Sequence, residues 1–111
     1  MDSYEVIMTP DSVSDLMEIR NYIADVLLAP ETALSYIRSV RKEIAKLEYM
    51  ATGIAPVPDE SWHSRGLRKI AARNFYVYYR IDEDSKRVYV LNIICTRRDQ
   101  LKQINKMNFD D

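Results

Sequence analysis

The chain has 111 residues, of which 47% are hydrophobic and 30% charged, and its formal net charge is −1. This size and composition predict one compact domain over residues 1–111, because a chain of about 100 residues can bury a single hydrophobic core. The longest apolar runs fall short of the roughly 20 residues of a membrane span and the first residues lack the pattern of a signal peptide, so we expect a cytoplasmic protein without membrane contacts.

Charge is unevenly distributed along the chain. Residues 1–61 carry 5 basic and 11 acidic side chains, whereas residues 62–106 carry 11 basic and 4 acidic ones. A basic half joined to an acidic half indicates an anionic partner for one side of the molecule, although a solvated surface can also produce such a split. The only cysteine, Cys95, ends an apolar run and is expected in or near the core.

The first half of the chain predicts a strand followed by two helices. Residues 4–9 alternate in a strand-like way, with a pattern that suggests cover on both faces. Thr9 and Pro10 then favour a helix start, and this helix is expected to reach about Leu28. A second helix begins near Pro30. The apolar stripes expected in the core are Val13, Leu16, Ile19, Ile23, Val26 and Leu27 on the first helix, and Ala33, Ile37, Val40, Ile44 and Leu47 on the second.

Residues 51–66 hold both glycines and two of the four prolines, and they predict a long loop. Trp62 in this loop is expected to pin it to the core, and His63, the only histidine, has no special role in this interpretation. One histidine and one cysteine at these positions cannot build a metal site, so no metal is expected.

Three strands are predicted next, over residues 67–73, 75–81 and 87–95. If Arg73 and Asn74 form a two-residue hairpin in which Asn74 takes the positive φ, Ala72 faces Phe75 and Ile70 faces Val77. Phe75, Val77 and Ile81 then belong to the core face with Tyr79 partly buried, while Lys69, Tyr76, Tyr78 and Arg80 share the outward face. A register slip of one residue would bury Lys69 and Arg80. An ordinary amphipathic sheet surface would give the same outward pattern.

A short final helix is expected to start near Arg98, capped by Thr96, with Leu101 and Ile104 pointing inward. The predicted fold class is therefore α+β: a strand, a helical hairpin, an antiparallel three-stranded meander and a short C-terminal helix, in the order β-α-α-β-β-β-α.

This order resembles the RelE/ParE superfamily of toxins from bacterial type II toxin–antitoxin modules. The resemblance is carried by "YEVIMTPDSVSDLMEIRNYI", by "GLRKIAARNFYVYYRIDEDSKRVYVLNII" and by "TRRDQLKQI", and it covers about residues 4–104. It implies a toxin that inhibits growth, a cognate antitoxin protein as partner, no cofactor, and contact with operator DNA only through the toxin–antitoxin complex.

RelE-like members cleave mRNA on the ribosome without a metal, and the resemblance implies Lys69 and Arg98 as the matching catalytic residues. A lysine amid arginines can act as a base, and an arginine fork suits a phosphate that gains charge. RNA or partner binding would fall to Arg68, Arg73, Tyr76, Tyr78, Arg80 and Arg97.

The set departs from the RelE pattern at two positions, since Tyr76 stands where RelE carries an arginine and Ile104 where it carries a tyrosine. The C-terminus "NKMNFDD" also lacks the histidine and tyrosine of YoeB-like members, and the sequence pI of about 5.8 is low for a protein among ribosomal phosphates. The first expectation is ribosome-dependent mRNA cleavage. The alternative is a ParE-like protein that inhibits DNA gyrase without catalysis, for which the same residues form a contact surface.

Overall fold

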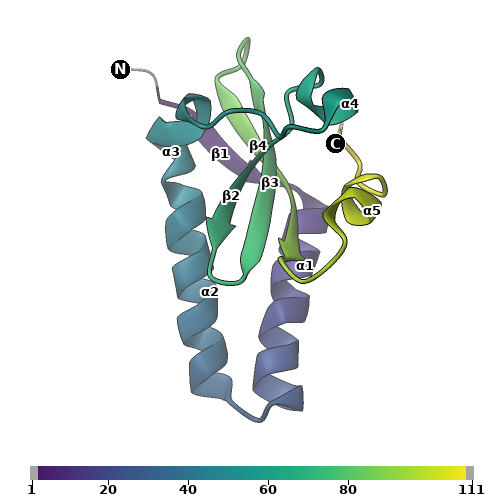
Figure 1. The fold of residues 1–111 in the computed structure, drawn as a ribbon. Helices are drawn as coiled ribbons and strands as arrows, with labels where there is room; N and C mark the ends of the chain where they lie inside the picture. Colours follow the sequence, from purple (N-terminus) through teal and green to yellow (C-terminus); the bar gives the residue numbers. More distant parts are fainter. Residues whose placement is uncertain (1–2, 110–111) are drawn as a thin grey trace.

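A four-stranded sheet with the strand order β1-β4-β3-β2 organises the chain, whose computed structural model describes residues 3–109 (Figure 1). The last three strands form an antiparallel meander, as predicted, while the first strand pairs in parallel with the last. The predicted α+β class is confirmed, and the parallel pairing of β1 with β4 extends the sheet to four strands. The strands are β1 (Glu5–Met8), β2 (Arg68–Ala72), β3 (Phe75–Asp82) and β4 (Arg87–Cys95).

The predicted register between β2 and β3 is confirmed. Ala72 pairs with Phe75 and Ile70 with Val77 around a two-residue turn. The prediction that Asn74 takes the positive φ was wrong, because Arg73 does so with a φ of 57°. The Asn74 side chain instead accepts a hydrogen bond from the Tyr36 hydroxyl at 3.2 Å, which ties the turn to the helical hairpin.

The first helix, α1 (Pro10–Asn21), begins as predicted. The Thr9 hydroxyl oxygen accepts from the Ser12 amide at 3.3 Å, and Pro10 occupies the first turn. The helix continues as a π-helix, η1 (Tyr22–Val26). In the short connection to the next helix, Leu28 has a φ of 52°. The second helix, α2 (Pro30–Ala45), follows, and the two helices form an antiparallel hairpin that reaches beyond the sheet (Figure 1).

The stripe predicted on the first helix was only partly right. Leu16 and Ile23 are buried, but Val13, Val26 and Leu27 are exposed. Val26 and Leu27 follow the start of the π-helix, whose wider turn shifts side chains from the angular position that a 3.6-residue period predicts. Val13 precedes the π-helix and faces solvent from the first turn of α1. The far end of the hairpin also has no sheet to pack against (Figure 1).

The main core lies between the helical hairpin and one face of the sheet. Val40, Ile44 and Leu47 pack there with Val77 and Tyr79, and all five are buried. Four of the five positions predicted for the stripe of the second helix are buried, Ala33, Val40, Ile44 and Leu47, and Ile37 is partly buried. The helix itself is shorter than predicted, because α2 ends at Ala45, before Leu47. Tyr79 is fully buried rather than partly so, because its hydroxyl finds a partner in the Ala51 carbonyl at 2.8 Å.

The other face of the sheet, predicted to point outward, carries a second hydrophobic cluster. It consists of Val57, Trp62, Leu67, Tyr78, Leu91, Ile94 and Ile104. The segment predicted as a loop, residues 51–66, supplies Val57 and Trp62 to this cluster. It is not all loop, since it contains the short turn η2 (Ala51–Gly53) and α4 (Glu60–His63), and α3 (Leu47–Met50) directly precedes it. Trp62 is buried and its indole Nε1–H donates to Asn105 Oδ1 at 3.0 Å, which confirms that this residue pins the segment.

The last helix, α5 (Gln100–Ile104), starts two residues later than predicted. Asp99, not Thr96, caps it by accepting from the Lys102 amide at 3.2 Å. Ile104 is buried as predicted, but Leu101 is 48% exposed, because a helix of only five residues turns a single side toward the sheet. Within residues 3–109 no helix is long and apolar enough to cross a membrane. The two residues at each end of the predicted domain 1–111 lie outside the described residues.

Candidate functional site

A lysine and two tyrosines meet on the sheet face opposite the helical hairpin, and we call Lys69, Tyr76 and Tyr78 the basic–aromatic cluster. The register places Lys69 opposite Tyr78 and Ala71 opposite Tyr76. Lys69 Nζ lies 4.1 Å from the centroid of the Tyr76 ring and 6.0 Å from that of Tyr78, within the range of cation–π attraction. The two rings meet edge to face at 6.5 Å. The strand pairing thus assembles the cluster as the sequence predicts.

Tyr78 is the member of the cluster whose environment the sequence mispredicted. Its side chain is buried, because α4 and α5 cover this part of the sheet. Its hydroxyl donates to Gln100 Oε1 at 2.8 Å, and burial raises the pKa of the phenol to about 12. A buried phenol with this partner has no free face on which a base can stack.

Phe109, near the C-terminus, contacts two arginines, Arg80 on β3 and Arg65 in the segment before β2. Arg80 Nε donates to the Phe109 carbonyl at 2.8 Å, and its guanidinium carbon lies 4.3 Å from the centroid of the Tyr89 ring. Arg65 lies between Trp62 and Phe109, with its guanidinium carbon 4.7 Å and 4.5 Å from the two ring centroids. These contacts engage both guanidinium groups in structural roles.

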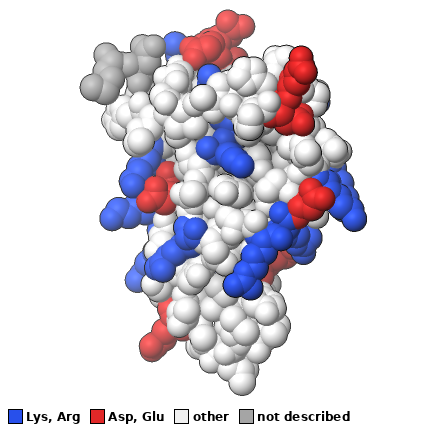
Figure 2. All heavy atoms as spheres, viewed as in Figure 1, with Lys and Arg blue, Asp and Glu red and all other residues white. Residues whose placement is uncertain are grey.

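Arg68 begins β2, and Arg73 follows its last residue in the turn to β3. Arg73 Nη2 donates to Ser39 Oγ at 3.0 Å, and its guanidinium carbon lies 4.8 Å from the centroid of the Tyr36 ring. Arg68 Nε is buried and has no hydrogen-bond partner within residues 3–109. Figure 2 shows Lys and Arg side chains spread over the face of the molecule that carries β2 and β3.

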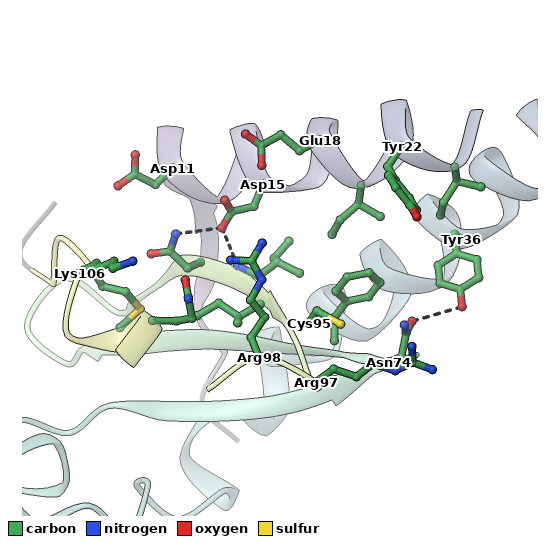
Figure 3. A pocket seen from close by; sticks show the side chains of 18 of the residues that line it. Asp11, Asp15, Glu18, Tyr22, Tyr36, Asn74, Cys95, Arg97, Arg98 and Lys106 are labelled. Carbon is green, nitrogen blue, oxygen red and sulfur yellow. Dashed lines mark hydrogen bonds between the residues drawn. The ribbon is translucent and has the colours of Figure 1, made fainter. Parts of the chain in front are cut away.

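Arg97 and Arg98 lie elsewhere, in a groove of about 830 Å³ between the helical hairpin, the end of β4 and the turn before α5. The hairpin end of the groove is lined by Tyr22, Tyr36 and Phe75, and the other end by charged side chains. Arg98 points toward α1 and Asp15 (Figure 3). Cys95 lies within the groove, between these two ends.

Three carboxylates of α1, those of Asp11, Asp15 and Glu18, line the same groove. Asp15 Oδ2 accepts from the Ile93 amide and from Asn92 Nδ2, both at 2.9 Å. Burial raises the pKa of Asp15, the two hydrogen bonds oppose this shift, and the neighbouring Glu18 and Asp11 add to it. Asp15 thereby accepts a hydrogen bond from a backbone N–H of β4 that lies beyond the end of β1, where no neighbouring strand pairs with it.

The structure therefore places the predicted site residues in two regions. Lys69 belongs to the basic–aromatic cluster, whereas Arg98 and Arg97 line the groove on the other side of β4. Sequence reasoning missed the carboxylates of the groove. The spacing of Asp11, Asp15 and Glu18 by four and three residues is a signal that could have found them, since it places all three on one side of a helix.

Groups that could hold a metal ion, meaning three or more His, Cys, Asp or Glu side chains together, do not occur in the described part of the chain. His63 is exposed, and its Nδ1 lies 3.0 Å from the Val57 carbonyl oxygen. This contact helps to fold the segment before β2.

Comparison with known proteins finds relatives of this chain by sequence and by fold. Residues 6–100 match the family described as the ParE toxin of the type II toxin–antitoxin system parDE. A solved structure of the chromosomal ParDE toxin–antitoxin system from P. aeruginosa is similar over 84% of this chain and 96% of that chain, with 23% identity and a TM-score of 0.70. The RelBE2 toxin–antitoxin complex from Mycobacterium tuberculosis is similar over 84% and 98%, with 17% identity and a TM-score of 0.57. No curated protein sequence matches the chain.

Proposed function

Because the chain belongs to the ParE toxin family of type II toxin–antitoxin systems, we propose that it arrests bacterial growth by binding and inhibiting DNA gyrase, without cutting RNA. A cognate antitoxin protein is the proposed partner that holds it inactive. Both proposals extend to this chain what the family resemblance implies, and the geometry of the candidate residues supports the choice between the two activities known for the superfamily.

The separation of Lys69 and Arg98 is the observation that carries the proposal. Metal-independent RNA cleavage needs a base and a phosphate-binding cation that converge on one phosphate. Lys69 Nζ stands over the Tyr76 ring, on the sheet face away from the helical hairpin, whereas Arg98 points toward α1. The two side chains are therefore poorly placed to act on the same phosphate.

The charges in the groove also argue against RNA cleavage. Arg98 shares the groove with Asp11, Asp15 and Glu18, and negative carboxylates repel the phosphates of an RNA strand. The phenol of Tyr78, with a pKa of about 12 and a hydrogen bond to Gln100, is poorly suited to exchange protons near neutral pH.

Exposed apolar side chains on the helical hairpin support a binding function. Tyr22, Val26, Leu27 and Leu28 are between 54% and 82% exposed at the end of the hairpin, which Figure 2 shows as largely uncharged. Soluble proteins rarely expose large apolar side chains together unless another protein covers them. This favours a toxin that works by holding a protein.

The structural relatives support a cognate antitoxin as the partner, because both come from toxin–antitoxin systems. The similar chain from P. aeruginosa belongs to a ParDE toxin–antitoxin system, and the one from M. tuberculosis comes from a toxin–antitoxin complex. The basic half of the sequence, residues 62–106, suits a partner with acidic segments. Contact with operator DNA would come through the antitoxin, as the resemblance implies.

Ribosome-dependent mRNA cleavage is the competing function, and one observation favours it. Lys69 and Tyr76 are both half-buried and in contact, so the pair still presents a cation and a phenol to solvent at the surface of β2 and β3. A movement of the turn before α5 that brought Arg98 to this pair would assemble a catalytic set.

Expression in bacterial cells tests the two functions against each other. The wild-type chain is compared with the double variant Lys69→Ala/Arg98→Ala and with a control, Lys42→Ala/Lys102→Ala, which removes two exposed lysines elsewhere. New 5′ ends in translated mRNA report RNA cleavage, and double-stranded DNA breaks report poisoning of gyrase.

We expect DNA breaks and growth arrest from the wild type, without new mRNA ends, and little change in either variant. Folding should survive in both, because surface substitutions usually change stability by less than about 0.5 kcal/mol. If new mRNA ends form with the wild type and with the control, but not with Lys69→Ala/Arg98→Ala, the chain is a ribonuclease and the proposal is wrong.

A further inference from the structure

Helix α2 presents one face to solvent along the side of the molecule (Figure 1). Ala33, Val40 and Ile44 are buried on its inner face. Six side chains at helical spacing line a shallow groove of about 410 Å³ on its outer face: Glu31, Leu34, Ser35, Arg38, Ser39 and Lys42. Leu34 in this groove is 52% exposed, so an apolar side chain at the middle of the face has no cover.

The two ends of this groove carry opposite charge. Glu31 lies in the first turn of α2, and Arg38 and Lys42 follow two and three turns later. Arg73 adds to the basic end, because its Nη2 donates to Ser39 Oγ at 3.0 Å. Among the residues that the structure describes, neither Glu31 nor Arg38 forms a salt bridge. The two lie about 10 Å apart along the helix axis, too far to pair with each other.

A second copy of α2 running in the opposite direction matches this order of charges. A two-fold axis between Leu34 and Ser35 places Glu31 of one copy opposite Arg38 of the other, and symmetry forms the same pair twice. Each pair lies about 5 Å along the helix from the axis. Helices pack with their axes about 8–10 Å apart, so both pairs are within reach of these long side chains.

The uncharged positions of the groove fit the same arrangement. The two-fold axis places Leu34 of each copy against Ser35 of the other, where a small side chain leaves room for a large one. Both leucines then leave water, which favours association. By the same count Lys42 lies near the end of the other hairpin, where the exposed Leu27 can pack against its methylene groups.

Charge argues against other occupants of this face. A wholly acidic segment would be repelled at Glu31, and a wholly basic one at Arg38 and Lys42, whereas a reversed copy meets the opposite sign at both ends. The side of the sheet that carries β2 differs in this respect. Residues 61–81 there contain no acidic side chain, so two copies meeting through β2 would bring like charges together.

We propose that α2 binds α2 of a second copy in an antiparallel, two-fold symmetric dimer, with Glu31 of each copy paired with Arg38 of the other and Leu34 packed on Ser35. A face of one helix of 16 residues, about 24 Å long, is smaller than the roughly 800 Å² per partner of a standard interface. We therefore expect a weak dimer, with a dissociation constant on the order of 100 µM. This inference goes beyond the proposed gyrase inhibition and does not rest on it.

Sedimentation of the purified full chain tests for the dimer. Protein concentrations from about 10 µM to about 1 mM bracket the expected constant. We expect a monomer–dimer equilibrium in which the dimer predominates at the upper end of this range.

Two charge variants test the pairing itself. Glu31→Lys and Arg38→Glu each place like charges at both pairs of their own dimer, and each should weaken it at least about tenfold. An equimolar mixture of the two variants restores opposite charges at both pairs, so a heterodimer should form about as well as the wild-type dimer. Glu60→Lys and Lys102→Glu are the matched controls, because they make the same charge changes at exposed positions elsewhere. Each control alone should dimerise like the wild type.

A leucine pair tests the apolar contact. Leu34→Ala removes a side chain from the interface twice and should weaken the dimer at least about tenfold. Leu101→Ala truncates a leucine of similar exposure, 48% against 52%, on another helix, and the dissociation constant should stay within about twofold of the wild type. Thermal unfolding of dilute samples checks that every variant is folded.

The proposal is overturned if the folded wild type stays monomeric at about 1 mM, ten times the expected constant. It is also overturned if the mixture of Glu31→Lys and Arg38→Glu associates no better than either variant alone, or if Leu34→Ala and Leu101→Ala dimerise equally well. None of these results bears on gyrase inhibition. A protein that dimerises as described but leaves gyrase active contradicts only the proposed function, so the two failures are distinguishable.

Discussion

Replacing Asp15 by alanine should destabilise the protein at the point where β4 extends past β1. Asp15 Oδ2 accepts from the Ile93 amide and from Asn92 Nδ2, and Asn92 Oδ1 is itself buried without a partner within residues 3–109. The alanine variant loses both bonds and leaves the Ile93 amide unsatisfied. Hydrogen bonds to charged groups contribute about 1.5–3 kcal/mol each, and the relief of carboxylate desolvation offsets part of this, so we expect a net loss of about 2–4 kcal/mol.

Urea and thermal unfolding measure this loss. For a chain of this length it corresponds to a fall in Tm of roughly 8–16 °C. Asp15→Asn is the matched control, because its amide oxygen can still accept from the Ile93 amide, and we expect it to lose only about 1 kcal/mol. Hydrogen exchange at Ile93 should accelerate in the alanine variant and stay close to wild type in the asparagine variant.

The pKa of Asp15 adds a pH dependence with a definite sign. Burial raises it above the ordinary value of 3.8, so the folded protein binds the proton more tightly than the unfolded chain does. This stabilising contribution is fully present below pH 3.8 and is lost as the pH rises through the folded-state value. Relative to Asp15→Asn, the wild type should therefore lose stability across this window. An alanine variant within about 0.5 kcal/mol of wild type, or a difference between wild type and Asp15→Asn that does not change with pH, would refute the reasoning.

Three further substitutions test other parts of the fold. Val77→Ala should lower the free energy of unfolding by about 1–3 kcal/mol in urea titration, because this fully buried side chain packs between the sheet and the hairpin. Tyr79→Phe leaves the Ala51 carbonyl without its 2.8 Å partner and should lower the free energy of unfolding by about 1–2 kcal/mol. Burial raises the pKa of the Tyr79 phenol to about 12, so the wild type should lose stability relative to this variant as the pH rises from 10 toward 12. Leu28→Gly should raise Tm, because Leu28 is 82% exposed at a φ of 52°, where a non-glycine residue costs about 1–2 kcal/mol; an unchanged or lower Tm would contradict this.

Local signals in the sequence predicted much of the fold. The pairing of Ala72 with Phe75 followed from a two-residue turn, and the start of α1 followed from Thr9 and Pro10, because each depends on neighbouring residues alone. The stripe of the first helix failed at Val26 and Leu27, where the α-helix has become a π-helix, since a change of helical turn is not visible in apolar spacing. It also failed at Val13, because spacing alone does not show that the first turn of α1 faces solvent on that side.

Strand periodicity could not predict that other segments cover the sheet face opposite the helical hairpin. Alternation shows which side chains share a face, but not whether another segment packs on that face. Trp62, Ile104 and Phe109 supply that cover and bury Tyr78. Apolar residues in a segment predicted as a loop were the available signal, because they need a surface to pack against.

The candidate site was predictable in one part and not in the other. Lys69 and Tyr76 were expected on one face, because strand register determines neighbours across a sheet. The direction of Arg98 depends on the turn before α5, where Asp99 caps the helix and Gln100 Nε2 donates to the Arg98 carbonyl at 2.8 Å. These contacts involve residues that no periodicity connects.

Supercoiling by purified DNA gyrase, measured with and without the purified protein, tests the central claim most directly. We expect the wild-type protein and the Lys69→Ala/Arg98→Ala variant to inhibit supercoiling of relaxed plasmid to the same extent, and neither to cleave mRNA in a translating extract. Supercoiling that proceeds unchanged at a large excess of folded protein, together with mRNA cleavage in the extract that the double variant abolishes, would contradict the account.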